Sequence, residues 1–143
     1  MTSARVCTFW VGELLLGIDV DNVVEIAREL VPTPVPLSDP SVSGLVNLRG
    51  RILTAVDARR LLQLHEPVES DDPTGGVSII VAAQDDVVAL IVDREGDIVQ
   101  VADYDREPVP ETISVGLRSR VSGAFQVPGA LLLVLDSDRV LVV

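Results

Sequence analysis

Apolar residues occur along the chain in short runs of about four to eight, separated by Gly, Pro and Asp, as in an all-β barrel or sandwich. The spacing typical of long amphipathic helices is missing from the sequence. The pattern predicts strands at Arg5 to Val11, Leu14 to Asp19, Leu45 to Leu48, Arg51 to Val56, Val77 to Ala83, Val87 to Val92, Ile98 to Ala102, Val121 to Val127 and Leu131 to Leu135.

Short helical turns are predicted where an Asp next to a preceding strand can accept from the first free amides of a helix. These turns fall at Asp21 to Ile26, Ala58 to Leu64 and Asp138 to Leu141. The segment from His65 to Gly76 is rich in Pro, Asp and Gly and poor in apolar residues, which indicates an exposed connector. It divides the chain near its middle.

The two sides of that connector resemble each other. Val42 to Leu62 and Val121 to Leu141 share eight identities in 21 positions at an offset of 79 residues, and Gly17 to Ile26 matches Ala89 to Ile98 more weakly at an offset of 72. We therefore expect one β unit over residues 14–64 and a second over 77–143, joined by the connector 65–76, with terminal strands able to cross between units.

Residues that recur in both copies are expected to build the unit. Gly50 and Gly129 suit the positive φ of a hairpin tip, and Asp57 and Asp136 suit helix capping after a buried strand. A pair of carboxylates for acid–base catalysis would not require an Asp at the same position in both repeats. These Asp residues are therefore interpreted as structural.

Residues present in one copy alone are free for another role. The first hairpin tip carries Asn47-Leu48-Arg49-Gly50, whereas the second carries Gln126-Val127-Pro128-Gly129. Since the second hairpin has no guanidinium, Arg49 is a candidate for contact with a partner or for an internal pair. The alternative for Arg49 is a solvated turn residue.

The predicted turn after the second strand differs in the same way. Val23 and Val24 stand where the second copy has Glu95 and Gly96. They are either half-exposed anchors for a partner or ordinary core valines. Glu25 would pair with Arg49 if this turn lies next to the hairpin.

Composition and charge exclude several classes of function. The 143 residues are 48% hydrophobic, enough for one compact domain or two fused subdomains. The net charge of -11 disfavours nucleic acid and anionic lipid, and all 11 cations are Arg, which excludes lysine chemistry. Cys7 is the only cysteine, and no signal peptide or membrane-spanning run is found, so the expected location is the cytoplasm.

The order Phe9, Gly12, Gly17-Ile18-Asp19, Val23-x-Glu25-Ile26, Asn47-Leu48-Arg49-Gly50 and Val56-Asp57-x-Arg59 resembles the CheW-like domain of bacterial chemotaxis. The resemblance covers nearly the whole chain. It implies an all-β fold of two pseudo-repeated five-stranded SH3-like or OB-like β-barrels packed over a shared core, with short helical turns. It also implies a non-enzymatic adaptor without cofactors.

The same resemblance implies the partners and the contact residues. The partners are the regulatory domain of a CheA-type histidine kinase and the cytoplasmic hairpin tip of chemoreceptors, in chemotaxis or in a pathway for surface motility or pili. The expected partner-binding residues are Val23, Val24, Glu25, Asn47, Leu48, Arg49 and Gly50, with Glu25 paired to Arg49 and an apolar groove rimmed by Val23, Val24 and Leu48.

A second class of function starts from the acidic residues. An acid-rich β-barrel protein or enzyme would use a small ligand or a metal, for instance at Asp103-Tyr104-Asp105 or Asp136-Ser137-Asp138. Neither segment has the Gly and the later Glu of a calcium-binding EF-hand loop. The sequence also has no Ser-His-Asp, GxSxG, GxGxxG or CxxC arrangement, and so no catalytic residue is assigned.

Overall fold

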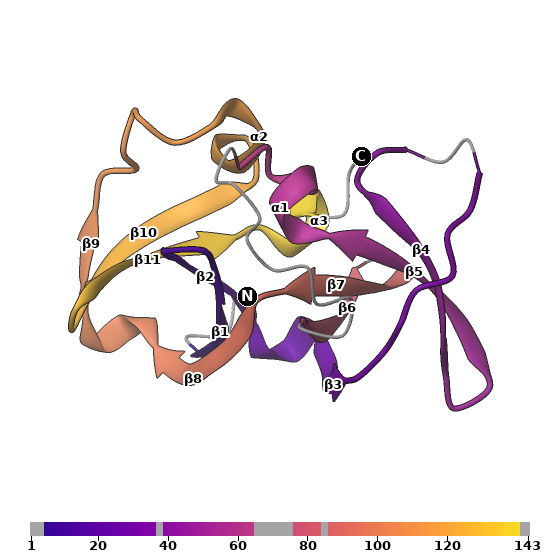
Figure 1. Cartoon of the computed structure of the whole chain (residues 1–143). Coiled ribbons are helices and arrows are strands. Elements are labelled where there is room, and N and C mark those ends of the chain that lie inside the picture. Colours follow the sequence, from indigo (N-terminus) through magenta and orange to yellow (C-terminus); the bar gives the residue numbers. More distant parts are fainter. Residues whose placement is uncertain (1–4, 37–38, 65–75, 84–85, 141–143) are drawn as a thin grey trace.

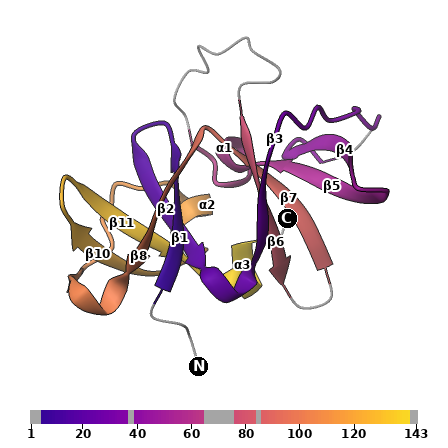
Figure 2. The same cartoon turned by 90° about the horizontal axis from the view of Figure 1, so that it is seen from below.

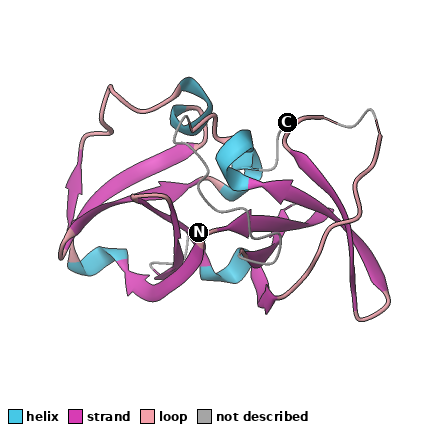
Figure 3. Ribbon diagram, in the orientation of Figure 1, coloured by secondary structure: helices cyan, strands magenta, loops and turns pink. Residues whose placement is uncertain are grey.

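The computed structural model describes residues 5–36, 39–64, 76–83 and 86–140. Within these residues the chain forms strands, short α-helices and single 3-10 turns (Figures 1 and 3). In chain order the elements are β1 (Arg5–Val11), β2 (Leu14–Asp19), η1 (Val20–Asn22), β3 (Val23–Arg28), β4 (Val42–Leu48), β5 (Arg51–Asp57), α1 (Ala58–Leu61), β6 (Val77–Ala83), β7 (Asp86–Val92), β8 (Arg94–Gln100), η2 (Val101–Asp103), β9 (Asp105–Glu107), α2 (Val115–Arg118), β10 (Val121–Val127), β11 (Ala130–Leu135) and α3 (Ser137–Val140).

The strands form two sheets. The first sheet has six strands in the order β8-β1-β2-β11-β10-β9, and the second has five in the order β3-β6-β7-β5-β4. Figure 2 shows the sheets side by side, with the hairpin of β4 and β5 extending away from the first sheet. Two five-stranded units are therefore confirmed, and the short β9 adds an edge to the first.

The two sheets are related by the sequence repeat. In the repeat, the counterparts of β1, β2, β3, β4 and β5 are β6, β7, β8, β10 and β11. When each strand of the second sheet, β3-β6-β7-β5-β4, is exchanged for its counterpart, the order becomes β8-β1-β2-β11-β10, which is the first sheet without β9. Each sheet contains one parallel pair at the equivalent place, β5 with β7 and β2 with β11. Each repeat thus gives two strands to one sheet and three to the other.

The structure identifies which strands cross between the expected units 14–64 and 77–143. The second sheet takes β6 and β7 from beyond the connector, because β6 pairs with β3 and β7 pairs with β5. The chain crosses between sheets at η1 and again at Asp93, between β7 and β8. Apart from Gly76, the predicted connector 65–76 lies outside the described residues.

Both faces of the central strands are buried, which explains their continuous apolar runs. On β2, Leu15 belongs to a core inside the first sheet, while Leu16 and Ile18 belong to a large core shared by both sheets. On β6, Ile80 faces a core inside the second sheet, while Ile79 and Val81 face the shared core. Alternate residues thus serve two cores, and the expected pair of barrels over a shared core is confirmed.

The predicted helical turn at Asp21 to Ile26 is wrong. Only residues 20–22 form a 3-10 turn, and the β-branched residues that follow form β3, which pairs with β6. The strand predicted at Ile98 to Ala102 begins instead at Arg94, because pairing with β1 rather than apolar character sets its length. Sequence reasoning missed β9 and α2.

Candidate functional site: the Glu25–Arg49 surface

The hairpin of β4 and β5 turns through two residues with left-handed backbone conformation. Arg49 has a φ of 52° and Gly50 a φ of 85°. Both central residues of a type I′ turn need positive φ, which twists the two strands in the favoured sense. The amide of Gly50 donates to Oδ1 of Asn47 at 2.8 Å, so Asn47 and Gly50 build the turn that presents Arg49.

Arg49 and Glu25 form a two-point ion pair. Nη1 of Arg49 donates to Oε1 of Glu25 at 2.7 Å, and Nη2 donates to Oε2 at 2.8 Å. The pair connects the two edges of the second sheet, β3 and the β4–β5 hairpin. The Arg49 side chain is 76% exposed and that of Glu25 is 23% exposed, so the guanidinium faces solvent while its partner is held in the surface. The predicted pairing is confirmed.

The two valines beside Glu25 have different surroundings. Val23 packs partly buried against the shared core, whereas Val24 is 58% exposed on the other side of β3. Leu48 is half-buried against the core of the second sheet. Val24 is therefore the exposed anchor of this set, and Val23 and Leu48 support the surface from beneath.

A further apolar feature of this hairpin escaped the sequence analysis. Asn47 lies opposite Ile52, and Leu45 lies opposite Thr54, so these four side chains share the outward face. Ile52 is 60% exposed and Leu45 is 40% exposed. Strand alternation was the available signal, because Val46 and Leu53 are buried and their neighbours must point outward.

The equivalent place in the first sheet has no such pair. Counting along the two repeats, Pro128 stands for Arg49 and Asp97 stands for Glu25. Gly129 keeps the positive φ, at 80°, but Pro128 has no guanidinium. The ion pair and its exposed apolar neighbours thus belong to one of the two similar sheets.

Two hollows among the described residues lie elsewhere. One, of about 260 Å³, is lined by residues of β4, β5, α1 and β7, and another, of about 620 Å³, lies on the first sheet. Neither is lined by Val23, Val24 or Leu48, so the predicted groove between the units stays a prediction. Among the described residues, no three His, Cys, Asp or Glu side chains converge as a metal site.

Cys7 is buried in β1, and burial raises the pKa of its thiol above the ordinary value. A protonated, enclosed thiol is a poor nucleophile.

None of the described helices is both long and apolar enough to span a bilayer.

Two linked β-barrels with an exposed ion pair and exposed apolar side chains on one sheet are typical of a domain that docks other proteins. Comparison with known proteins gives the family. The model of the CheW-like domain matches residues 5–143, and the chain belongs to that family.

Relatives from distant bacteria agree with this assignment. The chain is 32% identical over 138 residues to chemotaxis protein CheW of Thermotoga maritima, covering 96% of this chain and 87% of the relative. It is 33% identical over 133 residues to chemotaxis protein CheW of Rhizobium meliloti, covering 92% and 83%. Protein FrzA of Myxococcus xanthus is 36% identical over 58 residues, covering 41% of this chain and 36% of FrzA.

The fold is also similar to a solved structure, that of the scaffolding protein TtCheW from Thermoanaerobacter tengcongensis. The TM-score is 0.77 at 22% identity, and the match covers 95% of this chain and 90% of TtCheW. The chain is thus a chemotaxis adaptor domain of the CheW-like family.

Proposed function

We propose that this adaptor couples chemoreceptors to a CheA-type histidine kinase, and that the surface around Glu25 and Arg49 makes the contact. The proposed partners are the regulatory domain of the kinase and the cytoplasmic hairpin tip of the receptor. The role is that of a non-enzymatic scaffold in the cytoplasm. Family membership supports the pathway, and the geometry of the ion pair supports the surface.

The observation that carries the proposal is the presentation of Arg49. A non-glycine residue at positive φ costs roughly 1 kcal/mol, and the second hairpin avoids that cost with Pro-Gly. The first hairpin accepts the cost and places an arginine, oriented by Glu25, beside the exposed Val24. Arginine and apolar side chains held in fixed positions are typical of interface hot spots.

The test is binding by isothermal titration calorimetry to the purified kinase regulatory domain and, separately, to a receptor hairpin fragment. We expect Arg49→Ala to weaken at least one of these complexes while the circular dichroism spectrum stays unchanged. Arg118→Ala is the matched control, because Arg118 is an exposed arginine on α2 whose side chain, within the described part of the chain, donates only to the carbonyl of Pro110, at 3.3 Å. Equal affinities for both variants and the native chain would refute the proposed surface.

The similarity to FrzA raises a second pathway within the same role. FrzA matches less than half of the chain, so a motility pathway is proposed only as an alternative source of the kinase and receptor. Co-purification from a lysate followed by mass spectrometry separates the two. Capture of the kinase encoded with a chemotaxis receptor supports the first pathway, and capture of a motility kinase supports the second.

A further inference from the structure

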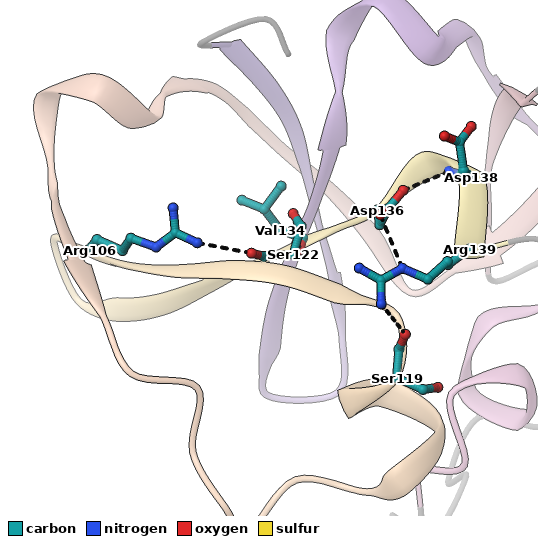
Figure 4. A network of polar contacts seen from close by, with 7 residues as sticks. All are labelled: Arg106, Ser119, Ser122, Val134, Asp136, Asp138 and Arg139. Carbon is teal, nitrogen blue, oxygen red and sulfur yellow. Dashed lines mark hydrogen bonds and ion pairs between the residues drawn. The ribbon is translucent and has the colours of Figure 1, made fainter. Parts of the chain in front are cut away.

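The first sheet carries a hollow of about 620 Å³ that is lined by acidic and by apolar residues. The acidic lining residues are Asp19, Asp21, Asp136 and Asp138, from the end of β2, the crossing at η1 and the start of α3. Val6 and Phe125 also line the hollow. Figure 4 shows Asp136 and Asp138 at one end of this region and Arg106 at the other.

The sequence repeat identifies the equivalent place in the other half. There, Arg59 of α1 donates from Nη2 to Oδ2 of Asp93, at 2.6 Å, at the crossing between β7 and β8. Counting along the repeats, Asp138 stands for Arg59 and Asp21 stands for Asp93. An arginine facing an aspartate in one half is therefore replaced by two aspartates in the other.

Two kinds of contact near this exchange occur in both halves. The amide of Asp57 donates to the carbonyl of Ser41 at 2.8 Å, and the amide of Asp136 donates to that of Arg120 at 2.8 Å. The arginine that follows the exchanged position, Arg60 in one half and Arg139 in the other, is present in both repeats. Arg60 donates to the carbonyl of Pro40, at 3.3 Å, and Arg139 to that of Ser119, at 3.2 Å. These contacts match between the halves, whereas the arginine at position 59 is replaced by the aspartate at position 138.

The exchange leaves two carboxylates without a counter-charge. Among the described residues, the carboxylates of Asp21 and Asp138 accept no hydrogen bond and form no ion pair, and only their backbone amides are used, each by a neighbouring Asp. Arg106 does not neutralise them. Its guanidinium donates to the carbonyl of Ser122 at 3.1 Å and lies 5.8 Å from the centre of the Phe125 ring.

We propose that this hollow receives an arginine side chain from a partner protein, in the place that Arg59 fills internally in the other half. The independent observation that names the ligand is Asp93, the counterpart of Asp21, which binds a guanidinium. The aliphatic stem would lie against apolar lining residues such as Val6 and Phe125 while the planar fork meets the carboxylates of Asp21 and Asp138. The site lies on the first sheet, so it is separate from the Glu25–Arg49 surface and does not depend on the proposed function.

The first test uses N-acetylarginine methylamide as the probe and follows amide signals of the isotope-labelled full chain by NMR. We expect saturable shifts at Asp21, Asn22 and Asp138, absent with N-acetylnorleucine methylamide at matched ionic strength. Equal shifts with calcium chloride would overturn the proposal in favour of general cation attraction. Shifts that depend on protein concentration without the probe would overturn it in favour of a second copy of this chain.

The second test supplies the arginine within the chain. In Asp138→Arg, the new side chain stands where Arg59 stands in the other half, and we expect it to pair with Asp21 and to weaken probe binding at least about fivefold. Asp21→Asn, which keeps size and removes charge, is expected to weaken probe binding too. Unchanged probe binding in both variants would refute the site.

Discussion

Arg28 of β3 forms an ion pair with Glu95 of β8, so the strands that occupy equivalent places in the two sheets are joined to each other. The Arg28 side chain is 62% exposed. Water therefore screens the attraction, and holding two long side chains in place costs conformational entropy.

The stability of the chain is accordingly expected to depend little on this pair. Arg28→Ala should lower the free energy of unfolding by at most about 1 kcal/mol, measured by urea denaturation. The apolar core shared by the sheets, and not this bridge, holds them together. A loss of more than about 2 kcal/mol would show that the bridge is essential to the packing of the sheets.

Removal of the Arg49 guanidinium is expected to affect binding rather than folding. In Arg49→Ala, affinity for the contacted partner should fall by about 2 kcal/mol or more, roughly 30-fold, because a preoriented arginine is lost from the interface. The free energy of unfolding should change by less than about 1 kcal/mol, since the guanidinium is largely exposed. Titration calorimetry and urea denaturation on the same preparation separate the two effects.

Arg139 is expected to show the opposite behaviour. Its Nε donates to Oδ2 of Asp136 at 3.1 Å, and its Nη1 reaches the carbonyl of Ser119, so it ties α3 to the chain before β10. Arg139→Ala should lower the melting temperature more than Arg49→Ala and leave the affinity for the partner at the Glu25–Arg49 surface unchanged. Arg60→Ala, the counterpart in the other repeat, should behave alike. If Arg139→Ala weakens binding without loss of stability, its structural role is wrong.

Gly44 and Gly123 occupy the same place in the two repeats, but only Gly44 is expected to be irreplaceable. Gly44 has a φ of 146°, and an added Cβ would lie 2.2 Å from the carbonyl oxygen of Thr33. At Gly123 the nearest atom is a flexible arginine nitrogen at 3.2 Å. Gly44→Ala should cost more than about 2 kcal/mol of folding free energy, and Gly123→Ala clearly less, by urea denaturation. Equal losses would contradict this assignment.

The buried thiol makes stability fall at alkaline pH. Because the pKa of Cys7 is raised in the folded chain, its contribution is complete below the ordinary thiol pKa and is lost as pH rises towards the folded value. Cys7→Ala should remove this part of the alkaline loss. In native protein at neutral pH, Ellman's reagent should label Cys7 only after unfolding, and rapid labelling of the native state would contradict its burial.

The sequence predicted the all-β class, the repeat, both hairpins and the caps at Asp57 and Asp136, because each depends on local patterns of apolar, Gly and Asp residues. It also predicted the pairing of Glu25 with Arg49, through the family resemblance. The sequence did not predict that Val23 is partly buried and Val24 exposed, because spacing alone does not tell which side of a strand faces the core.

The sequence analysis allowed terminal strands to cross between units, but it did not identify which strands are exchanged. A repeat predicts that two units are similar, but pairing partners far apart in the chain decide which strands share a sheet. The parallel pairs of β2 with β11 and of β5 with β7 join segments whose local sequences carry no mark of each other.

This exchange sets an order on biosynthesis. The second sheet has all its strands once β7 has left the ribosome, whereas β1 lacks its neighbour β8, and β2 its parallel neighbour β11, until those later strands are made. Strand β2 therefore waits longer for its parallel neighbour than β5 does. A fragment ending at the connector leaves both barrels unfinished, so two separately expressed halves should recover structure only when mixed.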